Sequence, residues 1–403
     1  MDKNHKTIDK RRTPKRPKLL FLVHEDRFFW SHRLAVGRAA LRAGYEVIVA
    51  TRVLGDAQKF HDEGFRLISW RLIRESYSPI AELRAIRQMR QIYLSEKPDI
   101  VHHVALKPVL YGSISAMGRK DIRAVNALTG LGYLVASSSL KASFLRFFIW
   151  NAFRFFLNRQ NQRVLVENQD DKQLLIRKIK VLAENINLIP GSGVDLSCFE
   201  PTPEPSGTPV VLLASRMLWM KGIQEFVEAA GLLQSKGVKA RFVLAGDTDL
   251  SNPTGVPRQQ LVEWQRSGIV EWWGHQQEMP PIFNQANVVC LPSHGGEGVP
   301  TVLMEAAASG RPIVTTEVPG CRDIVRHGIN GILVPPKNSV ALAKAIEELL
   351  EDPAMRRQMA TRGREIAAQE FSQELIAKQI LAIYQELLRS CTPSDDAFNC
   401  ATN

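Results

Sequence analysis

Residues 293–316 read SHGGEGVPTVLMEAAASGRPIVTT and follow the apolar run NVVCLPS at 287–293. The apolar run predicts a buried strand. The longer segment then predicts a sharp glycine turn, a helix that begins at Pro300 and ends before Gly310, and the strand RPIVTT. A strand, a helix and a second strand in succession are typical of a parallel sheet covered by helices.

The same alternation extends from this segment in both directions. Further apolar runs predict strands at 210–215, 240–246, 269–274, 287–293, 311–316 and 331–336 in the second half, and at 19–23, 45–51, 65–70, 98–103 and 123–128 in the first. Segments with helical spacing, such as 31–43 and 340–351, lie between or after them. The expected fold class is therefore α/β, with two doubly wound, Rossmann-like domains facing a cleft.

A proline-rich break divides the chain. Residues 201–209 (PTPEPSGTP) contain four prolines and one glycine, which indicates an interdomain linker. The expected organisation is a basic flexible tail (1–17), a first domain (18–200), the linker (201–209), a second domain (210–371), a helix that packs back on the first domain (372–390) and a tail (391–403).

Charge is distributed unevenly over the 403 residues. Residues 1–200 contain 34 Lys+Arg and 19 Asp+Glu, a balance of +15, whereas the remainder contains 18 and 22, a balance of −4. The basic first half indicates that its partner is anionic. With 45% hydrophobic and 23% charged residues, the composition is that of a globular protein and excludes long disordered or collagen-like regions.

The cysteines and the apolar runs indicate the compartment. The five cysteines are scattered without a CxxC spacing, so neither a zinc site nor a disulfide framework is expected. No secretory signal is recognisable, and no stretch of about 18 uncharged apolar residues predicts a membrane span. We therefore expect a cytoplasmic protein.

Two glutamates accompany the glycine turn. Glu297 lies in the turn and Glu305 about one turn into the helix, with seven residues between them. The helix N-terminus offers free N–H groups to an anion such as a diphosphate, and both carboxylates are suited to accept hydrogen bonds from sugar hydroxyls. The alternative is a surface loop followed by a helix with an exposed glutamate.

A second candidate stretch, SRMLWMKG at 215–222, follows the first apolar run of the second half. Arg216 and Lys221 lie there at a strand-to-helix turn. An arginine at such a turn grips a diphosphate bidentately, and a lysine acts as a point charge. The alternative is a pair of ordinary basic residues at the start of a helix.

Together these stretches resemble glycosyltransferase family 4, which comprises retaining sugar transferases with the GT-B architecture. The resemblance rests on R-x4-K-G at 216–222, EGVPTVLMEAAASGRPIV at 297–314, PGCRDIVRHGINGILVPP at 319–336 and LAGD at 244–247. It implies that Arg216 and Lys221 hold the pyrophosphate of the sugar donor.

The same resemblance implies roles for the residues around the glycine turn. Glu305 would bind the nucleotide ribose, and Glu297 would face the donor sugar as a catalytic residue. The donor-binding turn would comprise Gly298, Val299, Pro300 and Thr301.

The first domain resembles a subgroup that adds N-acetylated sugars to lipid-diphosphate-linked acceptors. This resemblance rests on residues 27–51, 102–112 and 125–134. Many family members carry a double glycine in the first loop, where this chain has HEDRFFWSHR (24–33). Many also place a histidine, which meets the transferred sugar, where this chain has Thr129.

Other polar residues of the first domain are therefore candidates for substrate contact. His102 and His103 end an expected strand beside the cleft, and because neighbouring strand residues point to opposite faces, at most one is expected to meet the substrate as a catalytic residue. Candidates for contact with an acceptor or a phosphate are His32, Arg33, Lys107 and Thr129. The alternative for each is a structural or solvated side chain.

Residues 140–163 (LKASFLRFFIWNAFRFFLNRQNQR) combine seven aromatic with five basic residues and contain no acidic residue. This pattern favours contact with an anionic membrane surface, for which the candidates are Arg146, Phe147, Trp150 and Arg154. A buried helix with arginines at its edges is an alternative. A nucleic-acid surface is less favoured, because the motifs described above resemble those of enzymes that bind nucleotide sugars.

The sequence thus predicts a transferase that moves a hexosyl group from a nucleotide sugar to an acceptor in surface polysaccharide or glycan synthesis. By resemblance the group is N-acetylhexosaminyl, the donor a UDP-sugar and the acceptor polyprenyl-diphosphate-linked. No cofactor or metal is expected, because Arg216 and Lys221 supply positive charge at the leaving group and the only DxD-like motif is Asp247-Thr248-Asp249.

The expected location is the inner face of the cytoplasmic membrane, with peripheral attachment and no nucleic-acid partner. Two alternatives remain open. One is a nucleotide-sugar epimerase of similar fold, and the other is a non-catalytic, nucleotide-sugar-binding partner in an assembly.

Overall fold

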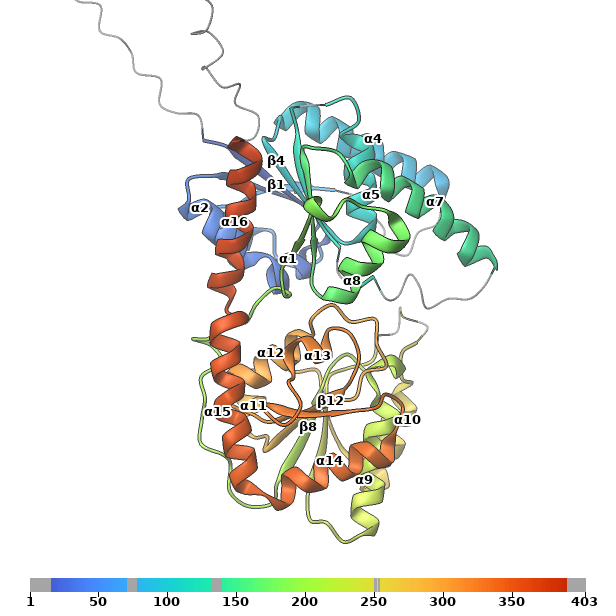
Figure 1. Cartoon of the computed structure of the whole chain (residues 1–403), viewed down its shortest axis with the longest axis vertical. Coiled ribbons are helices and arrows are strands. Elements are labelled where there is room, and N and C mark those ends of the chain that lie inside the picture. Colours follow the sequence, from blue (N-terminus) through green and yellow to red (C-terminus); the bar gives the residue numbers. More distant parts are fainter. Residues whose placement is uncertain are drawn as a thin grey trace, which may run out of the picture.

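The computed structural model describes residues 16–70, 78–119, 121–128, 130, 131, 140–249, 252 and 254–389, with side chains of the helix at 140–157 described from Phe147 onward. Apart from Arg16 and Pro17, the expected tails 1–17 and 391–403 lie outside these residues. Two α/β halves lie one above the other in Figure 1, and all paired strands in their sheets are parallel. The expected class, two doubly wound α/β domains, is confirmed.

The N-terminal half contains a seven-stranded sheet with the order β3-β2-β1-β4-β5-β6-β7. The strands are β1 (Lys18–Glu25), β2 (Glu46–Arg52), β3 (Arg66–Ser69), β4 (Ile100–Val104), β5 (Arg123–Ala127), β6 (Gln162–Val166) and β7 (Ile186–Leu188). The helices are α1 (Asp26–His32), α2 (Leu34–Arg42), α3 (Gln58–Asp62), α4 (Pro79–Glu96), α5 (Leu106–Ser115), α7 (Leu140–Leu157) and α8 (Gln169–Leu174). The central strands are buried along almost their whole length, as parallel strands covered on both faces require.

Three details of this half differ from the sequence prediction. The sequence pattern does not predict β6, which follows the aromatic–basic helix after only four residues, or β7, which has only three residues. The helix expected at 31–43 is two helices, because the backbone of Arg33 (φ −129°, ψ −6°) leaves the helical conformation.

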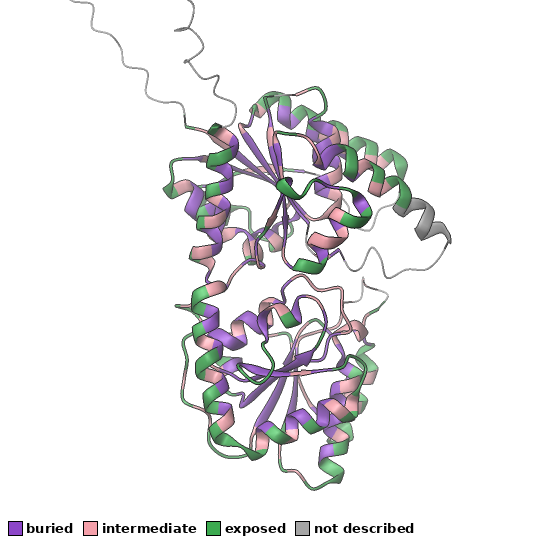
Figure 2. Ribbon diagram, in the orientation of Figure 1, coloured by how far each residue is buried: buried purple, intermediate pink, exposed green. Residues whose placement is uncertain are grey.

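The C-terminal half contains a six-stranded sheet with the order β10-β9-β8-β11-β12-β13. The strands are β8 (Val210–Ala214), β9 (Arg241–Ala245), β10 (Glu271–Gly274), β11 (Val288–Leu291), β12 (Ile313–Thr316) and β13 (Gly331–Val334). The helices are α9 (Ile223–Ser235), α10 (Arg258–Arg266), α11 (Pro280–Asn284), α12 (Thr301–Ala308), α13 (Cys321–Ile324), α14 (Ser339–Glu351) and α15 (Pro353–Glu370). All six strands expected from the sequence are present, and apolar clusters cover both faces of the sheet. The buried strands and exposed outer helix surfaces are visible in Figure 2.

Within the described residues the chain crosses between the halves twice, and the two crossings are hydrogen-bonded to each other. The N–H of Val194 donates to the Phe371 carbonyl at 2.8 Å, and the N–H of Gln373 donates to the Val194 carbonyl at 3.0 Å. The second crossing leads into α16 (Gln373–Arg389), which packs on α2 and contributes Ile380 and Tyr384 to the core of the N-terminal half (Figure 1). The last described helix therefore contributes to the core that covers the first sheet.

None of the helices in the described part of the chain combines the length and the apolar character needed to cross a membrane.

Candidate functional site

The glycine turn connects β11 to α12 at the boundary between the halves, where α8 approaches α12 and α13 (Figure 1). Gly295 and Gly296 have φ values of 122° and 77°, which side-chain-bearing residues rarely adopt. At Gly298 a Cβ atom would lie 1.7 Å from the carboxylate of Glu167, and at Gly320 one would lie 1.7 Å from the Gly298 carbonyl oxygen. Glycine is therefore favoured at 295 and 296 by the backbone conformation and at 320 by the close backbone contact, whereas a side chain at 298 would displace the Glu167 carboxylate.

Lys221 and Glu297 meet at this turn. The Lys221 Nζ lies 2.6 and 2.8 Å from the two carboxylate oxygens of Glu297, and the Ser293 hydroxyl donates to the same carboxylate at 2.8 Å. The two charged side chains are only 16% and 12% exposed, so bulk water screens their interaction weakly. This ion pair therefore connects the two motifs expected from the sequence, at 216–222 and 297–314.

The position of Lys221 depends on the turn that leads into α9. Residues Trp219–Lys221 form a 3-10 turn, and Gly222 follows with φ 76°. A Cβ atom at Gly222 would lie 2.0 Å from the Pro292 carbonyl oxygen, next to the glycine turn. Gly222 thus allows the loop after β8 and the loop after β11 to touch.

Arg216 has a different partner. Its Nη1 lies 3.2 Å from the Asp249 carboxylate, and its side chain is 50% exposed. Asp247, the other carboxylate of the DxD-like motif, lies 3.7 Å from Arg258. Within the described part of the chain, no three His, Cys, Asp or Glu side chains are grouped so as to hold a metal ion.

Glu305 lies in α12 and is half-buried. Burial raises the pKa of its carboxyl to about 8. No described residue forms a hydrogen bond with this carboxyl that would offset its desolvation. Its hydrogen-bonding capacity is therefore available to a ligand.

The N-terminal half reaches the turn through residues that follow β6. Glu167 accepts a hydrogen bond from the Val299 N–H at 3.0 Å, Asn168 donates to the Glu297 carbonyl at 3.4 Å, and Asp170 pairs with Arg322 at 2.7 Å. The sequence analysis did not select these residues. The sequence feature that could have identified them is their position after the carboxyl end of a parallel strand. The sequence analysis did not predict that strand, β6.

His102 and His103 were expected to end a strand beside the cleft, with at most one of them meeting the substrate, but neither side chain is accessible. Both are fully buried in the N-terminal half, on opposite faces of β4. His102 Nδ1 is hydrogen-bonded to the Tyr384 hydroxyl, whereas His103 lies 2.7 Å from both the Tyr93 hydroxyl and the Asn126 side-chain oxygen. Burial lowers the pKa of both imidazoles, that of His103 to about 4, so both are neutral core residues at neutral pH.

Among the acceptor candidates, His32 and Arg33 adjoin each other where α1 meets α2, whereas Lys107 lies at the start of α5. Arg33 is 4% exposed, donates to the His32 carbonyl at 2.9 Å and has an Nε without a partner. His32 lines a pocket of about 210 Å³ between α2 and the first crossing, and burial lowers its pKa to about 4. Lys107 pairs with Glu82 at 3.0 Å. Thr129 lies outside the described residues.

The aromatic–basic helix α7 is partly core and partly surface. Phe153 and Leu157 are buried, whereas Phe147 and Phe155 are 63% and 64% exposed. Trp150 is half-buried and Arg154 is exposed. The side chain of Arg146 lies outside the described residues.

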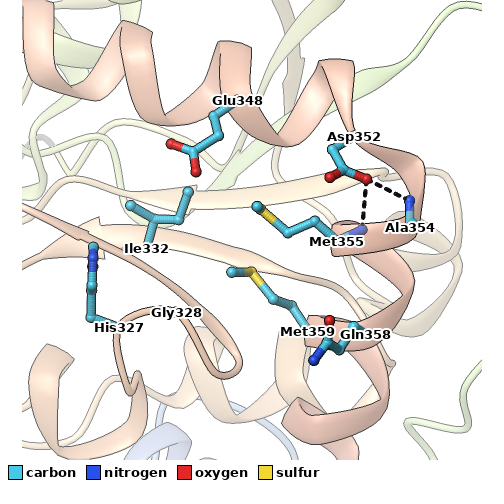
Figure 3. Close-up of a pocket in the computed structure, with 9 residues that line it drawn as sticks. All are labelled: His327, Gly328, Ile332, Glu348, Asp352, Ala354, Met355, Gln358 and Met359. Atoms are coloured by element: carbon cyan, nitrogen blue, oxygen red, sulfur yellow. Dashed lines mark hydrogen bonds between the residues drawn. The ribbon is translucent and has the colours of Figure 1, made fainter.

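A separate cavity of about 320 Å³ lies in the C-terminal half, between β13, α14 and α15 (Figure 3). Asp352 and Met355 lie on one side of it and His327 on the other. The Asp352 carboxylate is occupied in capping α15, where it accepts from the N–H groups of Ala354 and Met355 at 2.9 Å each. None of the expected site residues lines this cavity.

Two protein-family models match the chain: Glycosyl transferase 4-like at residues 18–168 and Glycosyl transferases group 1 at residues 208–352. A Campylobacter jejuni relative, the N,N'-diacetylbacillosaminyl-diphospho-undecaprenol alpha-1,3-N-acetylgalactosaminyltransferase, is 26% identical over 383 residues, which cover 92% of this chain and 99% of that protein. The Escherichia coli UDP-Gal:alpha-D-GlcNAc-diphosphoundecaprenol alpha-1,3-galactosyltransferase is 22% identical over 324 residues, covering 77% of this chain and 81% of that protein.

Among solved structures, a sucrose-phosphate synthase from Thermosynechococcus elongatus matches with a TM-score of 0.77 and 22% identity, covering 93% of this chain and all of that chain. At this identity the likeness concerns the fold alone, which is the GT-B architecture of two facing parallel-sheet domains.

Proposed function

The chain belongs to the family 4-like glycosyltransferases of the GT-B fold, and on that premise we propose that it transfers an N-acetylhexosaminyl group from a UDP-sugar to a polyprenyl-diphosphate-linked sugar. The observation that carries the proposal is the pairing of Lys221 with Glu297 beside the N-terminus of α12. This pair places a cation that can bind a diphosphate beside a carboxylate that can accept hydrogen bonds from sugar hydroxyls. The names of both relatives specify undecaprenyl-diphosphate-linked sugars, which supports this acceptor class.

The proposed donor site lies at the carboxyl edge of the second sheet. Lys221 and Arg216 contact the diphosphate, together with the N–H groups of Gly298, Val299 and Thr301; Pro300 belongs to the turn but has no N–H. Glu297 accepts hydrogen bonds from hydroxyls of the transferred sugar. Glu305, whose carboxyl no described residue engages, accepts them from the ribose.

The proposed chemistry is electrostatic. Breaking the bond between the sugar C1 and the diphosphate places negative charge on the leaving group, which Lys221, Arg216 and the α12 N-terminus stabilise. Retention of configuration, the mode that the family implies, requires the acceptor hydroxyl to attack from the face that the diphosphate leaves. The positive charge supplied by the protein removes the need for a metal, so we expect EDTA to leave the rate unchanged.

We assign the acceptor to the N-terminal half. Arg33 is the favoured phosphate contact, because it is a buried cation whose Nε has no partner among the described residues. Burial lowers its pKa, and a bound phosphate would relieve that cost. His32, Lys107 and Thr129 remain the other candidates.

We also propose peripheral attachment to an anionic membrane through α4 and α7, which both contact α5. Ile80 and Leu83 on α4 and Phe147 and Phe155 on α7 are exposed apolar side chains. Exposed arginines accompany them, namely Arg84, Arg87, Arg90 and Arg154. Apolar insertion combined with positive charge is the chemistry that binds a protein to anionic lipid surfaces.

The test is transfer of radiolabel from UDP-N-acetylhexosamines into the organic-extractable lipid of bacterial membranes. We expect label in the lipid with the wild-type protein, none with Glu305→Ala, and wild-type levels with Glu228→Ala, which removes an exposed carboxylate of α9. Equal labelling by Glu305→Ala would refute the site. An epimerised nucleotide sugar formed from donor alone would refute the reaction.

A further inference from the structure

Glu167 belongs to the N-terminal half but forms its hydrogen bond with the C-terminal half. Its Oε2 accepts from the Val299 N–H at 3.0 Å, between residues 132 positions apart in the sequence. That N–H lies two residues before the start of α12, within the turn proposed to bind the donor. A carboxylate of the protein therefore occupies a donor-site N–H in this structure.

The contact is close on both sides. A Cβ atom at Gly298 would lie 1.7 Å from Glu167 Oε2, so any larger residue at 298 would push the carboxylate away. The neighbouring Asn168 side chain donates to the Glu297 carbonyl at 3.4 Å, which brings the same segment against the next residue of the turn. The carboxylate is thus fitted into the turn from the opposite half.

The charged groups around Glu167 come from three elements. Arg33, between α1 and α2, favours the ionised carboxylate, whereas Asp171 of α8 and Glu297 of the turn oppose it. Desolvation is the largest influence and, together with the two acids, raises the pKa of Glu167 to about 7. Glu167 therefore changes charge near neutral pH.

We propose that the Glu167 carboxylate competes with the donor diphosphate for the Val299 N–H. It accepts a hydrogen bond from this N–H in the unliganded enzyme and must leave when the donor binds. The inference rests on the proposed donor site and adds a residue that determines its affinity. A diphosphate brings negative charge towards the turn, and an ionised carboxylate opposes it both by occupying the N–H and by repulsion. A protonated Glu167 opposes it less.

The proposal predicts the sign of a pH effect. As pH rises from about 6 to about 8, Glu167 ionises in the unliganded enzyme, so donor affinity falls by up to about tenfold. The diphosphate of a nucleotide sugar is a diester and lacks the weakly acidic terminal phosphate of free UDP, so this change comes from the protein. Glu305 and Asp171, with pKa values of about 8 and about 6, titrate in or near the same range. The contribution of Glu167 is therefore obtained by comparing the pH dependence of donor affinity in the wild type with that in a Glu167 variant.

The experiment measures binding of UDP-N-acetylgalactosamine by calorimetry at about pH 6, 7 and 8 for the wild type, Glu167→Gln, Glu167→Ala and a control. The control is Asp170→Asn, which breaks the Asp170–Arg322 pair, another contact between the halves. At about pH 8 we expect both Glu167 variants to bind about three to ten times more tightly than the wild type and to show a smaller pH dependence. Asp170→Asn should behave as the wild type.

A second readout needs no ligand. Amide hydrogen exchange of the peptide containing Val299 should be faster in Glu167→Ala than in the wild type, with the rest of the C-terminal half unchanged. Unchanged exchange, or variants that bind the nucleotide sugar no more tightly than the wild type, would overturn the proposal while leaving the donor site standing. Absence of binding in every protein, the wild type included, would overturn the proposed donor site and this inference with it.

Discussion

Two pairs of polar residues, one pair in each half of this glycosyltransferase, are placed in opposite ways. In the C-terminal half, Lys221 and Glu297 lie on loops at the edge of the sheet and remain partly exposed. In the N-terminal half, His102 and His103 lie inside a strand, are fully buried and form hydrogen bonds with core side chains. A polar group on a loop is available to a ligand, whereas one inside a strand contributes to the core.

This difference separates function from stability. Each core histidine forms at least one buried hydrogen bond, so its loss should cost stability without affecting the chemistry. The Glu305 carboxyl has the opposite character, because its burial raises its pKa to about 8 without a compensating hydrogen bond from any described residue. Its loss should cost activity and increase stability. Each variant below tests one side of this comparison.

The largest effect is expected from Lys221→Ala. Removing the cation at the leaving group should lower kcat/KM by about a hundred- to a thousandfold, because a preorganised charge in a water-poor site stabilises the transition state strongly. Steady-state transfer measures the loss. Lys236→Ala, which breaks a surface pair with Glu347, is the matched control and should keep full activity. If the Lys221→Ala enzyme remained fully active, the assignment of Lys221 to the donor diphosphate would be wrong.

Next in size is His103→Ala. The imidazole lies 2.7 Å from both the Tyr93 hydroxyl and the Asn126 side-chain oxygen, and Gly112 packs directly against its ring. Deleting it leaves a cavity and two buried groups without their hydrogen bond, which together should lower the free energy of unfolding by about 2–4 kcal/mol. Urea denaturation measures the loss.

Activity per folded molecule should be unchanged in His103→Ala. The exposed His61 of α3 provides the control, and His61→Ala should alter neither stability nor transfer. If folded His103→Ala lost transfer and kept its stability, the histidine would be catalytic and the comparison between the halves would fail.

Sequence patterns predicted the second half better than the first for a physical reason. All six strands of the C-terminal sheet are apolar runs separated by helices or turn residues, and a run of this kind can be recognised without the structure. β6 begins with Gln162 and Arg163 and follows α7 after four residues, so it merges with the basic segment before it.

The site shows the same limit. Lys221 and Glu297 lie in motifs whose spacing follows from a strand-to-helix turn, so their places could be predicted. Glu167 could not be found in this way, because its role depends on an unrecognised strand and on a contact between residues 132 positions apart. His102 and His103 were misplaced because strand alternation assigns opposite faces but does not reveal that both faces are covered by helices.

A smaller effect is expected on the exposed face of α7. Phe147 and Phe155 each expose more than half of their surface, and inserting both into a lipid interface should contribute about 2–3 kcal/mol. Changing both to serine should therefore weaken partition onto vesicles of phosphatidylglycerol and phosphatidylcholine by about thirty- to a hundred-and-fiftyfold, as measured by sedimentation. Leu232→Ser, an exposed apolar site on α9, should have no effect. If the double variant partitioned as the wild type does, α7 would not contribute to membrane binding and would serve only in the core.

The smallest effect is a gain of stability from Glu305→Gln. The carboxyl has its ordinary pKa of 4.5 in the unfolded chain and about 8 in the folded one, so the folded state holds one more proton between these values. This group therefore lowers the free energy of unfolding as pH rises from 4.5 to about 8. Glutamine does not titrate, so the Glu305→Gln variant lacks this pH-dependent loss of stability. At about pH 8 the variant should be more stable by at least about 1 kcal/mol, with little difference near pH 4.5.

Thermal denaturation at the two pH values measures this gain, and Glu228→Gln on the surface of α9 should show none. The outcome bears directly on the comparison between the halves. A buried carboxyl that formed part of the core would have acquired a hydrogen-bond partner, as His103 has, and its replacement would destabilise the protein. If Glu305→Gln is inactive and also more stable at about pH 8, the carboxyl is retained at the expense of stability because the ligand, not the fold, supplies its partner.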